Sequence, residues 1–189
     1  NFENTLNLFL DFPTSYDSYR HSVRKNNIAL PLSIVTPYLF YSLAYKKPNV
    51  FKKILTQDQL VLFSSIIKGI CLIFYAFEGF RSGINVLSFP LAFPLIIVGQ
   101  IQPKIYSIFG KVRAYYGWEL GLDNSPMSTG FPINLGHAQY KGCYLCLLGT
   151  YFCFYPSFRL TAFTALWGIM YFYITLIEST ECGRKEKTN

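Results

Sequence analysis

The sequence predicts an all-α integral membrane protein with about five membrane-embedded helices, the last two forming a hairpin. Composition is the first observation, because 51% of the 189 residues are hydrophobic, 19% are aromatic and only 14% are charged. Such a balance is unusually apolar for a water-soluble domain of this length. The second observation is that several long stretches contain no charged residue. These stretches are 26–45, 82–103, 142–158 and 160–177.

Each of these stretches is close to the ~20 apolar residues that a helix needs to cross the hydrocarbon core of a bilayer. Segment 60–80 is a further candidate, apolar except for Lys68 and Glu78. A soluble helical bundle would not need so many long uncharged segments in so short a chain. We therefore expect one domain, residues 1–189. Its expected spans are 28–45, 60–80, 84–109, 137–155 and 159–178.

Residues 1–26 are expected to form a polar or interfacial segment before the first span. Phe2, Leu6, Phe9 and Leu10 would share one helical face ahead of Pro13, which favours a short interfacial helix. A disordered tail is the alternative.

Prolines interrupt two of the expected spans, at Pro31 and Pro37 in the first and at Pro90 and Pro94 in the third. Membrane helices tolerate proline where neighbouring groups satisfy the freed carbonyls. We expect kinks at these positions. The last two spans should form a hairpin that turns at the sequence YPSF, residues 155–158.

The second span carries charges within its apolar run. Lys68 would either pair with a carboxylate or lie in a polar bundle interior, whereas Glu78 would lie near a membrane interface. Charges within a span also occur in channels and transporters, so that function class stays open.

The cysteines do not indicate a disulfide framework or a metal site. The chain has five cysteines, an odd count, and most lie in apolar segments, which favours reduced, buried thiols. Cys143 and Cys146 form a CxxC pair, but no second cysteine pair or histidine cluster completes a zinc site. We interpret the pair as packing residues and predict no metal.

The net charge of +7 is interpreted as a signal of membrane orientation. Basic residues flank the spans and form no single patch interleaved with aromatic residues, so no nucleic-acid partner is expected. If the chain has five spans, most of the basic residues fall on one side of the membrane. The positive-inside rule assigns that side to the cytosol or to the mitochondrial matrix. That side holds Lys46, Lys47, Lys52, Lys53, Lys104, Lys111, Arg113, Lys141, Arg184, Lys185 and Lys187. The other side holds Arg20, Arg24, Lys25, Arg81 and Arg159.

The same side carries the polar loop 110–142 and the C-terminal segment. Glu178 and Glu181 stand three residues apart and share a helical face. The loop supplies aromatic rings that can hold a cation, at Tyr115, Tyr116, Trp118 and Tyr140. Carboxylates and aromatic faces suit a sulfonium or an ammonium group. For any one of these residues alone, an interfacial aromatic belt or a solvated charge is the simpler interpretation.

The order of these features resembles the phospholipid methyltransferase family, above all its phosphatidylethanolamine N-methyltransferase members. The segments that carry the resemblance are GKVRAYYG, then FPINLGHAQYKG opening the hairpin, then a glutamate at the end of the last span. The wider family includes the isoprenylcysteine carboxyl methyltransferases. The amino-terminal segment VTPYLFYSLAYKK resembles the family's first long helix more weakly.

The resemblance implies a binding site for S-adenosylmethionine. In the family, a His-Pro-x-Tyr-x-Gly element and a Glu-Glu pair after the last helix help to bind this cofactor, and loop and glycine positions shape the pocket. By resemblance, the cofactor-binding residues here are Gly110, Gly117, Asn134, His137, Tyr140, Gly142 and Glu178.

The chain departs from the family pattern at some of these positions. Ala138 replaces the proline, Ser179 replaces the second acid, and bulky or basic residues including Arg113 separate Gly110 from Gly117. A missing carboxylate weakens the attraction for the cofactor's cationic groups, and a missing glycine leaves less room for it.

Two functions therefore stay open. One is S-adenosylmethionine-dependent methylation of a phospholipid headgroup amine, with Glu178, Glu181 and Asp123 as candidate proton acceptors. The other is a catalytically degenerate relative that serves as a structural, lipid-binding subunit of a larger membrane complex. Both predict a phospholipid partner and a location in the mitochondrial inner membrane or the endoplasmic reticulum.

Overall fold

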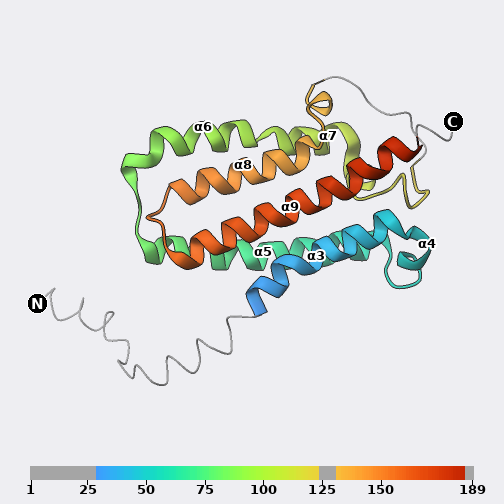
Figure 1. Ribbon diagram of the computed structural model, residues 1–189, viewed down its shortest axis with the longest axis horizontal. Coiled ribbons are helices and arrows are strands. Elements are labelled where there is room, and N and C mark those ends of the chain that lie inside the picture. The colour runs from blue at the N-terminus through green and yellow to red at the C-terminus, as the bar shows by residue number, and fades with distance from the viewer. Residues whose placement is uncertain (1–28, 124–130, 186–189) are drawn as a thin grey trace, which may run out of the picture.

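The computed structural model describes residues 29–123 and 131–185, and it is a bundle of helices (Figure 1). In these residues the one extended pairing is an antiparallel bridge between Ile84 and Phe154. The expected all-α class is confirmed. The interfacial helix expected within 1–26 lies outside the described residues.

The first described helices correspond to the first two expected spans. Helix α3 (Ala29–Lys46) leads through the short α4 (Pro48–Phe51) to α5 (Gln57–Ser82). A capping box starts α5, because the Thr56 side chain accepts from the Gln59 backbone N–H and the Gln59 side chain accepts from the Thr56 N–H. Gly83 ends α5 with a φ of 89°, a conformation that glycine adopts without strain.

The third expected span, 84–109, corresponds to the apolar helical stretch Val86–Ala114, which is divided into shorter helices. The chain first forms the 3₁₀ turn η1 (Val86–Ser88), then α6 (Phe89–Gly99) and α7 (Ile101–Ala114), with a break at Gln100. Gly110 lies inside α7 with a non-helical φ of 71° and ψ of 169°. The helical region therefore starts later and ends later than expected. Pro103, in the first turn of α7, cannot donate a backbone hydrogen bond to the end of α6.

The last two expected spans correspond to α8 (Ala138–Phe152) and α9 (Phe158–Lys185), preceded by the 3₁₀ turn η2 (Ile133–Leu135). They lie side by side and are joined by the short turn 153–157, which makes a hairpin (Figure 1). The Asn85 N–H donates to the Cys153 carbonyl and the Tyr155 N–H donates to the Gly83 carbonyl, which ties this turn to the α5–α6 connection.

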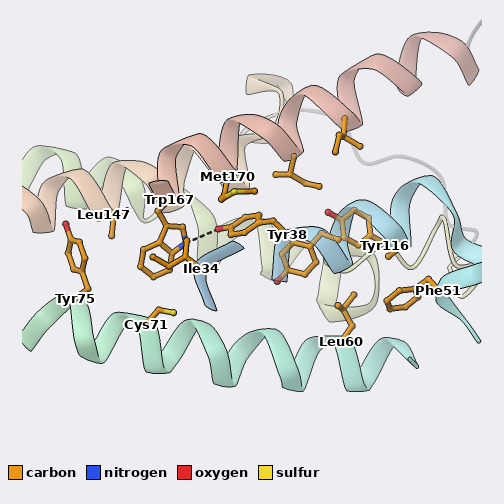
Figure 2. Packing of buried hydrophobic residues seen from close by; sticks show 14 of the residues in the cluster. Ile34, Tyr38, Phe51, Leu60, Cys71, Tyr75, Tyr116, Leu147, Trp167 and Met170 are labelled. Atoms are coloured by element: carbon orange, nitrogen blue, oxygen red, sulfur yellow. Dashed lines mark hydrogen bonds between the residues drawn. The ribbon is translucent and has the colours of Figure 1, made fainter. Parts of the chain in front are cut away.

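The core lies between α3, α5 and α9 and is rich in aromatic residues (Figure 2). The Trp167 indole N–H donates to the Tyr38 hydroxyl at 2.9 Å, and the Tyr75 hydroxyl is 2.8 Å from the hydroxyl of Thr164. These buried polar atoms are therefore paired within the bundle, as an apolar environment requires.

Helices α6 and α8 pack closely through glycine. A Cβ on Gly142 would lie 2.9 Å from the Gly99 carbonyl oxygen, and one on Gly149 would lie 2.7 Å from the Ala92 carbonyl oxygen. Small residues allow membrane helices to approach this closely. Gly142 and Gly149 of α8 thus allow α8 to lie close to α6.

Three helical stretches are long and apolar enough to cross a membrane: Gln57–Ser82, Val86–Ala114 and Phe158–Ser179. Large apolar side chains on their outer surfaces are exposed, including Ile73, Phe77, Ile97 and Phe172, each by more than 60%. These features are compatible with an integral membrane protein. Helix α8 has 15 residues, which makes it about 22 Å long and shorter than the ~30 Å hydrocarbon core.

Several described basic residues lie at the ends of the bundle, whereas Lys68 lies near the middle of α5. Lys52 and Lys53 follow α4, and Lys111 pairs with Asp58 near the start of α5. Arg81 and Arg159 lie at the other end, where α5 ends and α9 begins, and Arg159 pairs with Glu78 at 3.2 Å. The orientation expected from the sequence stays a prediction.

Candidate functional site

A cavity of about 330 Å³ lies at the end of the bundle that carries α4 and the last turn of α9. It is bounded by the second half of α7, the turn that follows α7, the start of α8 and the end of α9. Its polar and aromatic lining residues are Tyr45, Phe109, Arg113, Tyr116, Trp118, Glu119, His137, Gln139, Tyr140 and Glu178.

The carboxylate of Glu178 is the centre of the polar network. The hydroxyls of Tyr140 and Tyr116 donate to its Oε1 atom at 2.6 Å and 2.9 Å. The Nδ1 atom of His137 lies 3.1 Å from its Oε2 atom. An ionised carboxylate accepts about four hydrogen bonds, so one acceptor position on Oε2 remains for a ligand.

His137 connects the start of α8 to the end of α9. Its Nδ1 atom faces Glu178, and its Nε2 atom lies 2.8 Å from the Ser179 hydroxyl. The backbone of His137 has a φ of 50° and precedes the first residue of α8. Non-glycine residues rarely adopt this left-handed conformation, and strain of this kind clusters at functional sites.

Tyr116 is held in the same backbone conformation, with a φ of 61°. Its side chain is buried and lies 3.0 Å from the hydroxyl of Tyr140. Burial, together with the charge of the Glu178 carboxylate, raises the pKa of Tyr116 well above its ordinary value. The phenol is therefore a hydrogen-bond donor to Glu178 over the whole physiological pH range.

The turn after α7 aims these groups into the cavity. The Gly117 N–H donates to the Val112 carbonyl, and a Cβ on Gly117 would lie 2.6 Å from that oxygen. Only glycine fits this close approach. The turn thereby places Tyr116 and Trp118 on either side of Gly117 and against the start of α8.

The cavity combines aromatic faces with charges of both signs. The Arg113 guanidinium carbon lies 5.6 Å from the Phe109 ring centroid and 5.9 Å from that of Trp118. Glu119 and Glu178 supply carboxylates to the same cavity. A zwitterion with an additional cationic centre would find a guanidinium for its carboxylate, and carboxylates and rings for its cations.

The structure brings together three of the residues expected at the site, His137, Tyr140 and Glu178, because the start of α8 and the end of α9 meet at this cavity. The expected ring residues Tyr116 and Trp118 also line it.

The three expected glycines do not line this cavity. Gly142 packs against α6, Gly117 forms the turn after α7, and Gly110 breaks α7 with a positive φ. Their roles are to shape the backbone around the site. Gly142 faces the carbonyl of Gly99, and the expectation that it contributes to a cofactor site stays a prediction.

The remaining expected residues are Asn134, Glu181 and Asp123. Asn134 is in η2, and Glu181 is one turn beyond Glu178 on α9; the side chains of both are outside the described part of the structure. Asp123 is described and does not line the cavity, since it follows the turn after α7 and donates its N–H to the Gly117 carbonyl.

Sequence reasoning missed Tyr45, Phe109 and Glu119 as lining residues. Tyr45 ends the first span, and its hydroxyl donates to the Glu178 carbonyl at 3.0 Å. An aromatic residue at the end of a span is common in membrane proteins, so the sequence carried no specific signal for it. Glu119 was detectable as a carboxylate beside the aromatic run.

The described cysteines are unpaired thiols at positions 71, 143, 146 and 153. The Cys146 thiol lies 3.6 Å from the Ile96 carbonyl oxygen, at the contact between α6 and α8. Within the described residues, no group of histidine, cysteine and acidic side chains is arranged to hold a metal ion.

No protein-family model, curated protein or solved structure matches this chain.

Proposed function

We propose that the protein is a membrane-embedded methyltransferase that transfers a methyl group from S-adenosylmethionine to the amine of a phospholipid headgroup, phosphatidylethanolamine or its methylated derivatives. The observation that carries the proposal is the convergence of His137, Tyr140 and Glu178 on one aromatic cavity. These are the residues that the resemblance to phospholipid methyltransferases marks as cofactor ligands.

The cavity suits S-adenosylmethionine in size and in chemistry. Its volume of about 330 Å³ is at the lower end of the ~300–1,000 Å³ found for small-molecule sites. The free acceptor position of Glu178 would bind the cofactor's ammonium or a ribose hydroxyl, and Arg113 would bind its carboxylate. The rings of Tyr45, Tyr116 and Trp118 would face the sulfonium.

When bound, S-adenosylmethionine supplies an electrophilic methyl group. The lipid amine attacks in line, forming a nitrogen–carbon bond as the carbon–sulfur bond breaks and its electron pair stays on sulfur. The amine must be neutral to attack, so a nearby group has to accept its proton. Glu119 and Glu178 both line the cavity, so these two carboxylates are the candidate proton acceptors.

The proposal includes five membrane-embedded helices. The three long apolar stretches would cross the bilayer, while α3 and α8 would lie among them and place the cavity at the membrane interface. Helix α8 is covered by α6 and α9, so a length below that of the hydrocarbon core is tolerated. The membrane would be the endoplasmic reticulum or the mitochondrial inner membrane.

A second candidate is a degenerate relative that binds lipid without methylating it. The hydrogen bonds of Tyr116, Tyr140 and His137 to Glu178 favour this candidate, because three of the carboxylate's about four acceptor positions are taken without a cofactor. Ser179 supports it as well, since its hydroxyl bonds to His137 where the family has a second acid. Such a protein would serve as a subunit of a larger membrane complex.

Incubation of the purified protein with phosphatidylethanolamine and methyl-labelled S-adenosylmethionine decides between the two. The methyltransferase transfers label to the lipid. Ser179→Glu restores the missing acid and adds a charge-assisted hydrogen bond worth about 1.5–3 kcal/mol, so it should bind the cofactor at least about tenfold more tightly. If neither protein binds S-adenosylmethionine or transfers label, the lipid-binding subunit is the correct assignment.

A further inference from the structure

A second cavity, of about 300 Å³, lies deeper in the bundle, between α5, α7, α8 and α9 and the end of α3. It shares a wall with the Glu178 cavity. The residues that line both are Ala114, Tyr116, Gln139 and Tyr140. The deeper cavity is mostly apolar, but one of its lining residues is a lysine.

That lysine, Lys68, lies near the middle of α5, one of the stretches able to span a membrane. Its Nζ atom lies 4.8 Å from the ring centroid of Tyr41 and 5.3 Å from that of Tyr38. No carboxylate of a described residue lies within ion-pair distance of it. An ammonium group at membrane depth is costly, and such residues mark binding sites or transport pathways. The two rings stabilise the cation but do not neutralise it.

Tyr41, which lies beside Lys68, supplies a further observation. Its side chain is 3% exposed and lines the deeper cavity, and its hydroxyl has no acceptor among the described residues. A buried hydroxyl left unpaired costs about 1–3 kcal/mol. A ligand acceptor in the cavity would remove that cost. Gln102 and Tyr106 line the same cavity and add further possible donors.

We infer that the Lys68 cavity binds the phosphate group of a phospholipid. An anion with several acceptor oxygens matches a cation without a carboxylate and a hydroxyl without an acceptor. Leu72 lines the cavity and is 49% exposed on the outer surface of α5, so an acyl chain can leave the cavity over this residue. The ligand is therefore a lipid phosphodiester rather than free phosphate.

The inference does not depend on methyl transfer, because a lipid-binding subunit would use the same site. If the protein is a methyltransferase, the residues shared by the two cavities would bring the bound lipid next to the bound methyl donor. A phosphate at Lys68 would leave the headgroup amine next to Tyr116 and Tyr140, whose hydroxyls contact Glu178. The deeper cavity would then hold the lipid while the outer cavity holds the methyl donor.

The test is retention of lipid by the purified full chain in neutral detergent, measured by native mass spectrometry. The probes are short-chain phosphatidylethanolamine, a diacylglycerol with the same acyl chains, and inorganic phosphate. We expect phosphatidylethanolamine to bind and diacylglycerol not to bind. Lys68→Met should weaken phospholipid binding about tenfold or more, as the loss of a charge-assisted hydrogen bond requires. Lys53→Met, which removes an exposed lysine of the loop after α4, should change nothing.

Tyr41→Phe removes only the unpartnered oxygen and keeps the ring, so it serves as the test if Lys68→Met fails to fold. It should weaken phospholipid binding several-fold without lowering thermal stability. Equal binding of diacylglycerol, or unchanged phospholipid binding in both variants, would overturn the inference. Displacement of the lipid by millimolar inorganic phosphate would overturn its lipid part. None of these outcomes involves S-adenosylmethionine, so the result is separate from that of the methylation assay.

Discussion

Glu178 is held by three side chains from two different parts of the chain. Tyr116 follows α7, while His137 and Tyr140 belong to the start of α8. Each phenol has one hydroxyl proton. If both tyrosines donate that proton to Oε1, no proton lies between their two hydroxyl oxygens, and the 3.0 Å contact between them is not a hydrogen bond. The carboxylate is therefore what holds the two phenols together. Its negative charge organises the site whether or not a cofactor is bound.

Substitution at this carboxylate tests its role as a ligand. Glu178→Gln and His137→Ala should each lower the affinity for S-adenosylmethionine about tenfold or more, because each removes a charge-assisted hydrogen bond. Calorimetric titration in detergent measures this affinity. Asp58→Asn is the matched control, since Asp58 pairs with Lys111 in an exposed position away from the cavity lining. Unchanged affinity in both site variants would remove these residues from the binding site.

Tyr116 gives a pH dependence of stability. Its pKa is raised in the folded protein by burial and by the Glu178 charge, whereas in the unfolded chain it returns to about 10. Its stabilising contribution is fully present below about pH 10 and is lost as pH rises toward the folded-state pKa, because the unfolded chain then binds fewer protons. The thermal midpoint should fall above about pH 10, and less steeply in Tyr116→Phe. Tyr155→Phe, which removes an exposed phenol, should keep the wild-type slope.

The site residues found from the sequence are those with a motif around them. His137 and Tyr140 lie in one short segment, and Glu178 ends an uncharged run, so each stands out locally. Tyr45 carries no such signal, because its role arises only when α3 meets α9, whereas Glu119 had only the weak signal of a carboxylate beside aromatic residues. The sequence also could not predict that the Glu178 cavity and the deeper Lys68 cavity share lining residues, because this depends on how the helices pack.

At the scale of the elements, the order of helices was predictable and their breaks were not. Long runs with few or no charges identify α5 and α9 well, but the uninterrupted uncharged run from 82 to 103 hides the break at Gln100. The role of a glycine is equally hard to predict from the sequence. Gly110 and Gly142 were both expected near the cofactor, yet one takes a positive φ within α7 and the other packs against α6.

Two glycine substitutions test this packing. Gly142→Ala places a Cβ 2.9 Å from the Gly99 carbonyl oxygen, so it should destabilise the protein by about 1–3 kcal/mol through overpacking. Gly69→Ala meets nothing within 4 Å and should stabilise α5 by about 0.5–1 kcal/mol. Thermal unfolding in detergent measures both. If Gly142→Ala proved as stable as wild type, the close contact between α6 and α8 would be wrong.

At the scale of the whole molecule, the bundle has one end for the site and another for the hairpin turn. The first end carries α4 and the last turn of α9 (Figure 1), and the Glu178 cavity is lined by residues from this end. Glu78 and Arg159 lie at the second and pair across α5 and α9. A membrane between the two ends would place the site at one interface, on the side that carries more basic residues.

Cysteine labelling in sealed vesicles checks this orientation. Lys53→Cys and Pro156→Cys introduce thiols at exposed positions at opposite ends of the bundle. A membrane-impermeant maleimide should label only one of them from outside, and both after the vesicles are opened. The parent protein measures the background from the native thiols. Labelling of both positions from the same side would contradict the five-helix arrangement.

The central claim is that the Glu178 cavity holds S-adenosylmethionine, and photocrosslinking tests it most directly. Ultraviolet irradiation of the protein with radiolabelled S-adenosylmethionine should attach label to the aromatic lining, in peptides that contain Tyr116 and Trp118 or Tyr140. Excess S-adenosylhomocysteine should abolish the labelling. Label that no competitor displaces, or label confined to peptides that do not line this cavity, would contradict the claim.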